Sequence, residues 1–247
     1  MKKYTGNFGK LAEQYDSLRP AYPKHITSLI YGAITSKKPL ILDLGCGTGI
    51  STRQLAHKKS SVVIGCDIDG KMLKAALRYK KSNISYKRAA AEKLPFPDDK
   101  FDVVTSFIAF HWFMNKEAVH EIRRVLKPHG LFFVVQPRFA SFQKDFRIML
   151  EREIKQKIPR KYKIGNEIII FLNKNGFQTK RYVVKSDVKY TLDEYVNLLK
   201  SYSLWNYVPK PCHKEMENKL RMHFRSKLLN GYIRNVKDIE IITAANL

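Results

Sequence analysis

The stretch Asp43-Leu44-Gly45-Cys46-Gly47-Thr48-Gly49 (DLGCGTG) follows a short apolar run and precedes a segment with helical periodicity. A glycine-rich turn between a strand and a helix lets the backbone approach a ligand closely, because glycine has no Cβ and tolerates positive φ. This turn is not a phosphate-binding P-loop, since no lysine stands where G-x-x-x-x-G-K-[ST] requires one. It also departs from the dinucleotide fingerprint G-x-G-x-x-G, since its third glycine, Gly49, arrives one residue early.

Two carboxylates accompany this turn and restrict the ligand. Asp43 lies two residues before the first glycine, where its charge would repel a pyrophosphate and attract an ammonium or sulfonium group. Asp67 ends the next apolar run, 22 residues after Gly45, where nucleoside-binding βαβ units place the acidic residue that accepts the ribose hydroxyls. The ligand should therefore contain a ribose and a cationic tail but no phosphate. S-adenosylmethionine is the cofactor of that description.

The surrounding sequence predicts an α/β fold. Short apolar runs at 39–44, 62–66, 84–87, 101–107 and 131–135 read as strands, and the stretches 50–57, 70–79 and 116–126 between them read as helices. Strands buried on both faces and separated by helices indicate a Rossmann-like, doubly wound sheet that is mostly parallel. Past Pro137 we expect helices at 142–158, 167–174, 192–200 and 214–229 and strands at 178–190 and 239–243. These strands would bring the sheet to seven, with a helical cover.

The expected organisation has three consecutive segments within one compact domain. Residues 1–38 supply N-terminal helices, residues 39–137 the cofactor-binding core, and residues 138–247 complete the sheet and supply a helical substrate cover. A length of 247 residues with 44% hydrophobic content is sufficient for such a domain.

The net charge of +24 raises nucleic acid as a partner. Residues 1–137 hold 23 Lys and Arg against 11 Asp and Glu, and residues 138–247 hold the same numbers. This even spread, without a block of five like charges, favours a lysine-rich solvated surface over a dedicated groove. No nucleic-acid recognition module appears, so a small-molecule acceptor is expected and RNA is the alternative.

Localisation and metal content are inferred from what the sequence lacks. No apolar run approaches the roughly 18 residues of a membrane span, and no apolar h-region follows the first lysines. Three scattered cysteines form no disulfide framework, and the histidines show no metal-ligand spacing. We therefore expect a cytoplasmic protein with no membrane association and no bound metal; the oligomeric state is left open.

Several motifs together resemble one family, the class I S-adenosylmethionine-dependent methyltransferases. The similar subgroup contains the quinone-pathway C-methyltransferases and the trans-aconitate O-methyltransferase-like enzymes. The resemblance is close over residues 8–137 and looser afterwards. It rests on DLGCGTG, on Cys66-Asp67-Ile68, on Ala89–Phe113, on Glu121–Val134, and on Phe8–Pro23, which resembles the N-terminal helix of the subgroup.

The resemblance implies how the cofactor is bound. Asp43 and Gly45 hold the methionyl tail, Asp67 binds the ribose, and Ile68 packs on the adenine. Ala90 replaces the aspartate frequent in the family's third motif, so a backbone amide near Ala91 is left to meet the purine edge. Glu92 either binds the cofactor or faces outward. The cofactor-binding candidates are Asp43, Gly45, Cys46, Gly47, Gly49, Asp67, Ile68, Ala91, Glu92 and Phe107.

Methyl transfer from a sulfonium is an in-line displacement, so the protein mainly aligns the acceptor and excludes water. The segment Phe107–Phe113 follows the fourth strand at the edge where open α/β sheets bind ligands. His111 either acts there as a base or substrate-orienting group, or caps the next helix or bonds to the backbone. Trp112 is a pocket wall or a packing residue. Cys46 is a small residue in the turn, because the reaction needs no nucleophilic cysteine.

The N-terminal segment supplies further candidates. Tyr15, Arg19 and Tyr22 either fold over the cofactor, with Tyr15 close to the methyl donor, or belong to an amphipathic helix on the sheet edge. Arg19 could pair with a carboxylate of the substrate or of the cofactor. Tyr202 lies in the tyrosine-rich span 190–207, which lines the acceptor pocket or packs in the core.

The function expected from the sequence is methylation of a small molecule on oxygen or carbon. His111-Trp112-Phe113 and Ser201–Ser203 resemble the trans-aconitate-like branch and favour acid O-methylation. No [DN]-P-P-[YF] follows the fourth strand, which argues against N6-type base methylation. Two alternatives remain: an RNA methyltransferase, motivated by the charge, and a cofactor-binding protein without turnover, which Ala90 leaves open.

Overall fold

The computed structural model describes residues 16, 19, 21–79, 81–138, 141–158 and 165–246, the side chains of 141–144 excepted. Cα packing groups the chain into two compact units that interleave along the sequence. The sheet unit consists of Ala21–Arg138, Lys161–Val184 and Ile239–Leu247. The helical unit consists of Met1–Pro20, Phe139–Arg160 and Lys185–Asp238. The three consecutive segments expected from the sequence do not follow these divisions, and their assignment to one compact domain stays a prediction.

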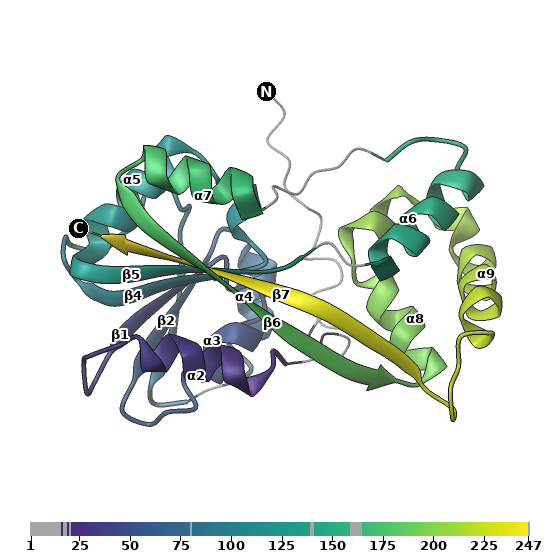
Figure 1. Ribbon diagram of the computed structural model, residues 1–247, viewed down its shortest axis with the longest axis horizontal. Coiled ribbons are helices and arrows are strands. Elements are labelled where there is room, and N and C mark those ends of the chain that lie inside the picture. The colour runs from purple at the N-terminus through teal and green to yellow at the C-terminus, as the bar shows by residue number, and fades with distance from the viewer. Residues whose placement is uncertain are drawn as a thin grey trace. The chain divides into compact units, whose positions relative to one another are not determined.

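A seven-stranded sheet confirms the predicted Rossmann-like α/β fold. Its strand order is β3-β2-β1-β4-β5-β7-β6 (Figure 1). The β1–β2, β1–β4, β2–β3 and β4–β5 pairs are parallel, and β5–β7 is antiparallel. Residues 185–190 of β6 and 233–238 of β7 belong to the helical unit. The strands are β1 (Leu40–Leu44), β2 (Val62–Asp67), β3 (Ile84–Arg88), β4 (Phe101–Phe107), β5 (Leu126–Pro137), β6 (Phe177–Tyr190) and β7 (Ile233–Asn246).

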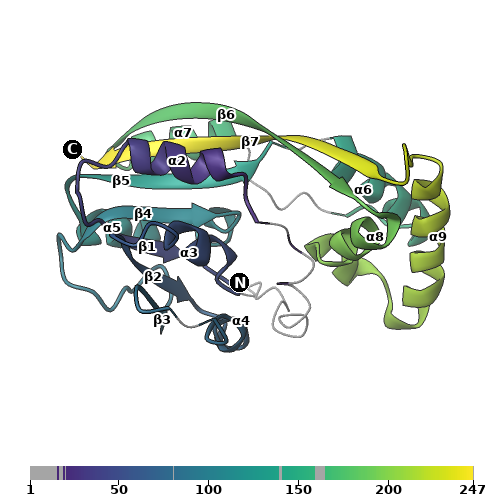
Figure 2. The ribbon, with the colours of Figure 1, turned by 90° about the horizontal axis from the view of Figure 1, so that it is seen from below.

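Helices cover both faces of this sheet (Figures 1 and 2). The helices α2 (Lys24–Gly32) and α3 (Ile50–Leu55) pack on one face, and α5 (Lys116–Val125) and α7 (Gly165–Lys174) pack on the other. The helix α4 (Gly70–Ala76) connects β2 to β3. Because both faces are covered, the central strands β1 and β4 are buried along nearly their whole length rather than at alternate residues.

The helical unit has its own hydrophobic core. Three helices of this unit supply pairs of core residues: Phe146 and Leu150, Tyr195 and Leu199, and Leu220 and Phe224. These helices are α6 (Ser141–Glu153), α8 (Leu192–Lys200) and α9 (His213–Arg225), with the short 3₁₀ turns η3 (Ser203–Tyr207) and η4 (Lys210–Cys212) between the last two. Among the described helices of both units, none combines the length and the apolar character needed to cross a membrane.

Two strands are longer than the sequence predicts. β5 begins at Leu126 instead of Leu131, because Leu126 pairs with Phe101 before the register shifts. β7 begins at Ile233 instead of Ile239. Ile233 and Asn235 are buried while Arg234 and Val236 are exposed, so the strand alternates as usual, but a polar residue at a buried position hides the pattern.

Candidate functional site

The predicted cofactor residues gather at one place in the sheet unit. The chain runs from β1 outward to β2 and β3, then returns to place β4 on the other side of β1. This reversal of strand order is a topological switch point, and open α/β sheets bind ligands outside the carboxyl ends of the strands there. The glycine turn follows β1, Asp67 ends β2, and Phe107 ends β4.

The glycine turn adopts a conformation that requires its glycines. Gly45, Gly47 and Gly49 have φ values of 73°, 56° and 81°, in the left-handed region that residues with a Cβ rarely occupy. A Cβ added to Gly45 would lie 2.5 Å from Ala109 Cβ in the segment after β4. The backbone nitrogens of Gly45 and Cys46 both donate to the Cys66 carbonyl, at 2.7 and 3.1 Å. The turn is thus fixed by β2 on one side and packed against the end of β4 on the other.

Asp43 is fully buried, and its carboxylate is hydrogen-bonded to other side chains of the protein. Its Oδ2 accepts hydrogen bonds from the hydroxyls of Ser51 (2.7 Å) and Thr52 (2.6 Å), and its Oδ1 accepts one from Thr105 (3.0 Å). Burial raises the pKa of this carboxyl, and the hydroxyl bonds and the charge of Asp67 modify it further. Sequence reasoning missed these three hydroxyl partners, although Ser51 and Thr52 open the helix after the glycine turn. The role of Asp43 toward the methionyl tail stays a prediction.

Asp67, the last residue of β2, links this strand to the glycine turn. Its Oδ2 accepts from the backbone nitrogen of Gly47 at 2.8 Å, and its Oδ1 from that of Asp69 at 2.9 Å. Burial raises the pKa of this carboxyl, while the two backbone donors lower it. A carboxylate offers about four lone-pair sites, so two backbone bonds leave acceptor capacity for hydroxyl donors. The next side chain, Ile68, is apolar yet 53% exposed, as suits a residue that packs on a flat ring.

The third predicted motif lies between β3 and β4. Ala91 is buried, and Ala90 pairs with Lys93 in an isolated bridge. Glu92 is exposed, and its Oε1 accepts from Asn115 Nδ2 at 2.8 Å. Of the two interpretations of Glu92, this geometry favours the outward one.

The end of β4 carries the candidate chemistry. His111 lies in the 3₁₀ turn η2 (Phe110–Trp112), three residues after Ile108, whose φ of 52° is unusual for a β-branched residue. Burial lowers the pKa of the imidazole from 6.5 to about 4. The alternative that His111 caps the next helix is wrong, because Asn115 caps α5 by accepting from Ala118 N at 2.8 Å. The Trp112 ring is partly exposed and its centroid lies 4.8 Å from that of His111.

The predicted substrate residues divide between the two units. Tyr22, in the sheet unit, lies with its ring 4.8 Å from that of Phe107, so it reaches the end of β4. Arg19, in the helical unit, lies 4.4 Å from the centroid of the Tyr202 ring. Its Nε donates to Ser201 Oγ at 3.0 Å and its Nη2 to the Ser201 carbonyl at 3.2 Å. Tyr15 lies outside the described residues, so its predicted role remains a prediction.

A metal centre has no support in the described portion of the chain, where no three His, Cys, Asp or Glu side chains are placed to hold an ion. The glycine turn, in contrast, lies next to an acidic strand tip, and a Cβ on Gly45 or Gly49 would collide with Ala109 or Tyr86. A carboxylate beside such a turn is suited to a phosphate-free nucleoside with a cationic tail.

Comparison with known proteins agrees with this geometry. A mostly parallel seven-stranded sheet with one antiparallel strand is the architecture of Rossmann-like methyltransferases, and residues 42–134 match the family described as a methyltransferase domain. Over this region the chain is similar to the class I S-adenosylmethionine-dependent methyltransferases. S-adenosylmethionine is the methyl donor of this class.

Two curated relatives indicate how far the likeness extends. An uncharacterized methyltransferase of Schizosaccharomyces pombe is 28% identical over 85% of this chain and 81% of that protein. A ubiquinone/menaquinone biosynthesis C-methyltransferase of Shewanella baltica is 35% identical over 53% of this chain and 58% of that protein. Other curated relatives are likewise matched over about half of their length.

Among solved structures, the YcgJ protein of Bacillus subtilis is similar with a TM-score of 0.61. The alignment covers 90% of this chain and 98% of that one at 21% identity. At this identity the likeness shows the fold alone.

Proposed function

We propose that this protein transfers a methyl group from S-adenosylmethionine to a small molecule, on oxygen or carbon. The observation that carries the proposal is Asp67, held at the tip of β2 by Gly47 N and followed by the exposed Ile68. In this proposal Asp67 binds the ribose hydroxyls, Ile68 packs on the adenine, and the glycine turn accepts the methionyl tail. The charge of Asp67 contributes to raising the pKa of Asp43, so a cationic ligand would be favoured beside the two carboxyls.

When bound, S-adenosylmethionine supplies an electrophilic methyl group on a sulfonium. The protein's contribution is to align the acceptor with that methyl and to keep water away. His111 is neutral at physiological pH and can accept a proton, but a pKa of about 4 makes it a weak base at pH 7. An acceptor that arrives ionised, such as a carboxylate, needs no base.

Two lines of support bear on the acceptor atom, and they favour different elements. The weak basicity of His111 and the trans-aconitate-like sequence motifs favour oxygen of an acid. The quinone relative is a C-methyltransferase by name, which favours carbon. We therefore propose a panel that contains both classes, with carboxylic acids placed first.

The cofactor half of the proposal is tested by calorimetry with Asp67→Ala. We expect S-adenosylmethionine to bind about 5- to 150-fold more weakly, because charge-assisted bonds to the ribose are worth about 1–3 kcal/mol. Glu117→Ala, which removes an exposed carboxylate from α5, should bind as the wild type does. Unchanged affinity in Asp67→Ala, or tighter binding of NAD than of S-adenosylmethionine, would refute the assignment.

The catalytic half is tested with a donor labelled on its methyl group and a panel of carboxylic acids, phenols, quinols and total RNA. Label in a small-molecule product supports the proposal. Label only in RNA supports the competing function, and tight donor binding without label in any product supports a binding protein without turnover.

A further inference from the structure

The helical unit contains a polar face that the methyltransferase assignment does not use. Within this unit the side chains of Ile233, Asn235 and Lys237 lie on one face of β7, because alternate residues of a strand point the same way. Ile233 is part of the hydrophobic core of the unit, so this face points inward. β6 is the neighbouring strand, and Tyr190 at its end belongs to the same core. Asn235 and Lys237 therefore lie at the edge of an apolar interior.

Asn235 is the clearest anomaly on this face. The residue is 3% exposed, and neither its Nδ2 nor its Oδ1 has a hydrogen-bond partner among the described residues. The Tyr190 hydroxyl is also buried, and within the same described set it has no partner. Buried polar groups are nearly always paired, because an unpaired one loses its water without compensation. Two such groups in one unit indicate hydrogen-bonding capacity reserved for a ligand.

Two cations belong to the same unit: Lys237 shares the face of β7 with Asn235, and Arg19 lies over the ring of Tyr202, which belongs to the same core as Tyr190. Burial and the positive charge of Arg19 lower the pKa of Lys237 from 10.5 to about 8, so the two charges repel each other. The Arg19 charge also acts on the Tyr190 phenol, whose pKa burial raises overall. Arg19 is held in place by Ser201 and by the ring of Tyr202. No carboxylate within the described ranges forms an ion pair with Lys237, so an anion is the missing partner.

We propose that Arg19, Lys237, Asn235 and Tyr190 form a binding site in the helical unit for a small molecule that carries a carboxylate. The two cations supply the charge, and the amide and phenol donate hydrogen bonds to the carboxylate oxygens. The identification of this carboxylate with the methyl acceptor rests on the proposed function. The existence of the binding site is independent of that function.

Succinate is a suitable probe, and calorimetry at pH 8.5 is the test. An anion beside Lys237 raises its pKa, so binding should take up protons, and the measured enthalpy should depend on the ionisation enthalpy of the buffer. Lys237→Met should bind succinate at least 10-fold more weakly and lose the proton uptake. Lys189→Met is the matched control: it removes the same charge from an exposed position on β6 and should behave as the wild type.

Asn235→Leu separates a binding role from a structural one. Because it removes an unpaired buried amide, we expect a higher melting temperature without ligand and at least 5-fold weaker binding of succinate. A structural asparagine would give the opposite: a lower melting temperature and unchanged affinity.

Wild-type affinity in both Lys237→Met and Asn235→Leu would overturn the proposal, as would inorganic phosphate binding more tightly than succinate. S-adenosylmethionine affinity, measured in the same variants, should be unchanged. If succinate binds as expected while no acceptor in the panel is methylated, the proposed function fails and this site stands. If methylation occurs without succinate binding, the reverse holds.

Discussion

Single residues at the carboxyl ends of β1 and β2 are bonded to the protein itself. Asp43 accepts hydrogen bonds from three hydroxyl groups. Asp67 accepts hydrogen bonds from two backbone N–H groups, one of them in the glycine turn. These bonds fix both carboxylates and the turn in one arrangement before any ligand binds. Such preorganisation lowers the ordering cost of binding. An inward-facing residue such as Asp43 can therefore affect ligand binding without touching the ligand, because it positions the glycine turn and contributes a negative charge.

His111 gives a prediction at the residue scale. Its pKa in the folded protein is about 4, below the 6.5 of an ordinary histidine. Between these values the unfolded chain binds more protons than the native protein, so the free energy of unfolding falls as the pH is lowered from about 6.5 to 4. His111→Gln should lose less stability over this window than the wild type, as measured by urea unfolding at pH 4.5 and pH 7.

The exposed His120 provides the control, since His120→Gln removes a histidine from α5 without removing a buried one. It should follow the wild-type curve. Parallel curves for His111→Gln and the wild type would contradict the lowered pKa.

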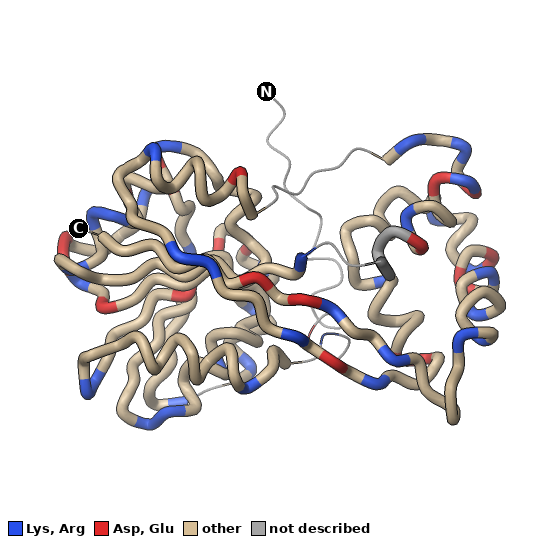
Figure 3. Tube along the Cα trace, in the orientation of Figure 1, with Lys and Arg blue, Asp and Glu red and all other residues tan. Residues whose placement is uncertain are grey.

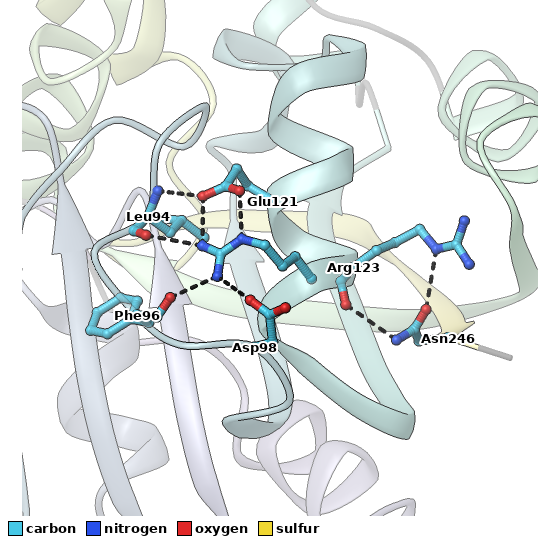
Figure 4. Close-up of polar contacts among 7 residues, drawn as sticks. Leu94, Phe96, Asp98, Glu121, Arg123 and Asn246 are labelled. Atoms are coloured by element: carbon cyan, nitrogen blue, oxygen red, sulfur yellow. Dashed lines mark hydrogen bonds and ion pairs between the residues drawn. The ribbon is translucent and has the colours of Figure 1, made fainter.

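Elements are fixed by side chains that cross between them, and Arg124 on α5 is the best example. Figure 4 labels the partners Leu94, Phe96, Asp98 and Glu121. The Arg124 guanidinium donates to the carbonyls of Leu94 (3.1 Å) and Phe96 (2.8 Å), and to the carboxylates of Glu121 and Asp98 (both 2.7 Å). Glu121 in turn accepts from Leu94 N at 2.7 Å. This network ties the segment between β3 and β4, which contains Ala91, to the helix.

Arg124→Met tests the network at the scale of the element. We expect a loss of about 1–3 kcal/mol in the free energy of unfolding, because two carbonyls and two carboxylates lose charge-assisted donors. Faster hydrogen exchange should appear at residues 94–98. The measurements are denaturant unfolding and exchange followed by mass spectrometry.

Lys127→Met is the comparison variant, because Lys127 forms one ion pair with Asp102 at 2.8 Å and its side chain is 45% exposed. Exposed pairs contribute at most about 1 kcal/mol. An equal loss in the two variants would show that Arg124 acts as an ordinary surface charge.

The whole molecule carries its excess positive charge over both units. Figure 3 shows Lys and Arg distributed along the trace and interspersed with Asp and Glu. Several cations of the helical unit are paired, among them Lys200 with Glu217, Lys227 with Asp145 and Arg234 with Asp187. This arrangement supports the interpretation of a solvated surface, and the net charge of +24 still predicts a general attraction to polyanions.

Salt dependence tests this interpretation. Binding of a fluorescent RNA should weaken about 10³-fold between 50 and 200 mM salt, because the attraction depends on counterion release. S-adenosylmethionine affinity should change little over the same range, since the site proposed for it lies at a partly buried strand end. RNA binding that persists at 200 mM salt and is accompanied by RNA methylation would favour the alternative function.

The sequence alone determined the class of this protein. Local features of the sequence carried this prediction: the glycine turn, Asp67, and the alternation of apolar runs with amphipathic stretches. Such features can be recognised in the sequence because positive φ, turn spacing and periodicity depend on residues that are close together in the chain. The tertiary structure decided what depends on residues far apart in the chain. It turned Asp43 toward hydroxyls of α3 and β4, turned Glu92 toward Asn115, and brought Arg19, Ser201 and Lys237 into one unit. The hydrophobic periodicity of the sequence does not predict such contacts. Packing between residues far apart in the chain decides which side chains meet and which buried polar groups are left for a ligand.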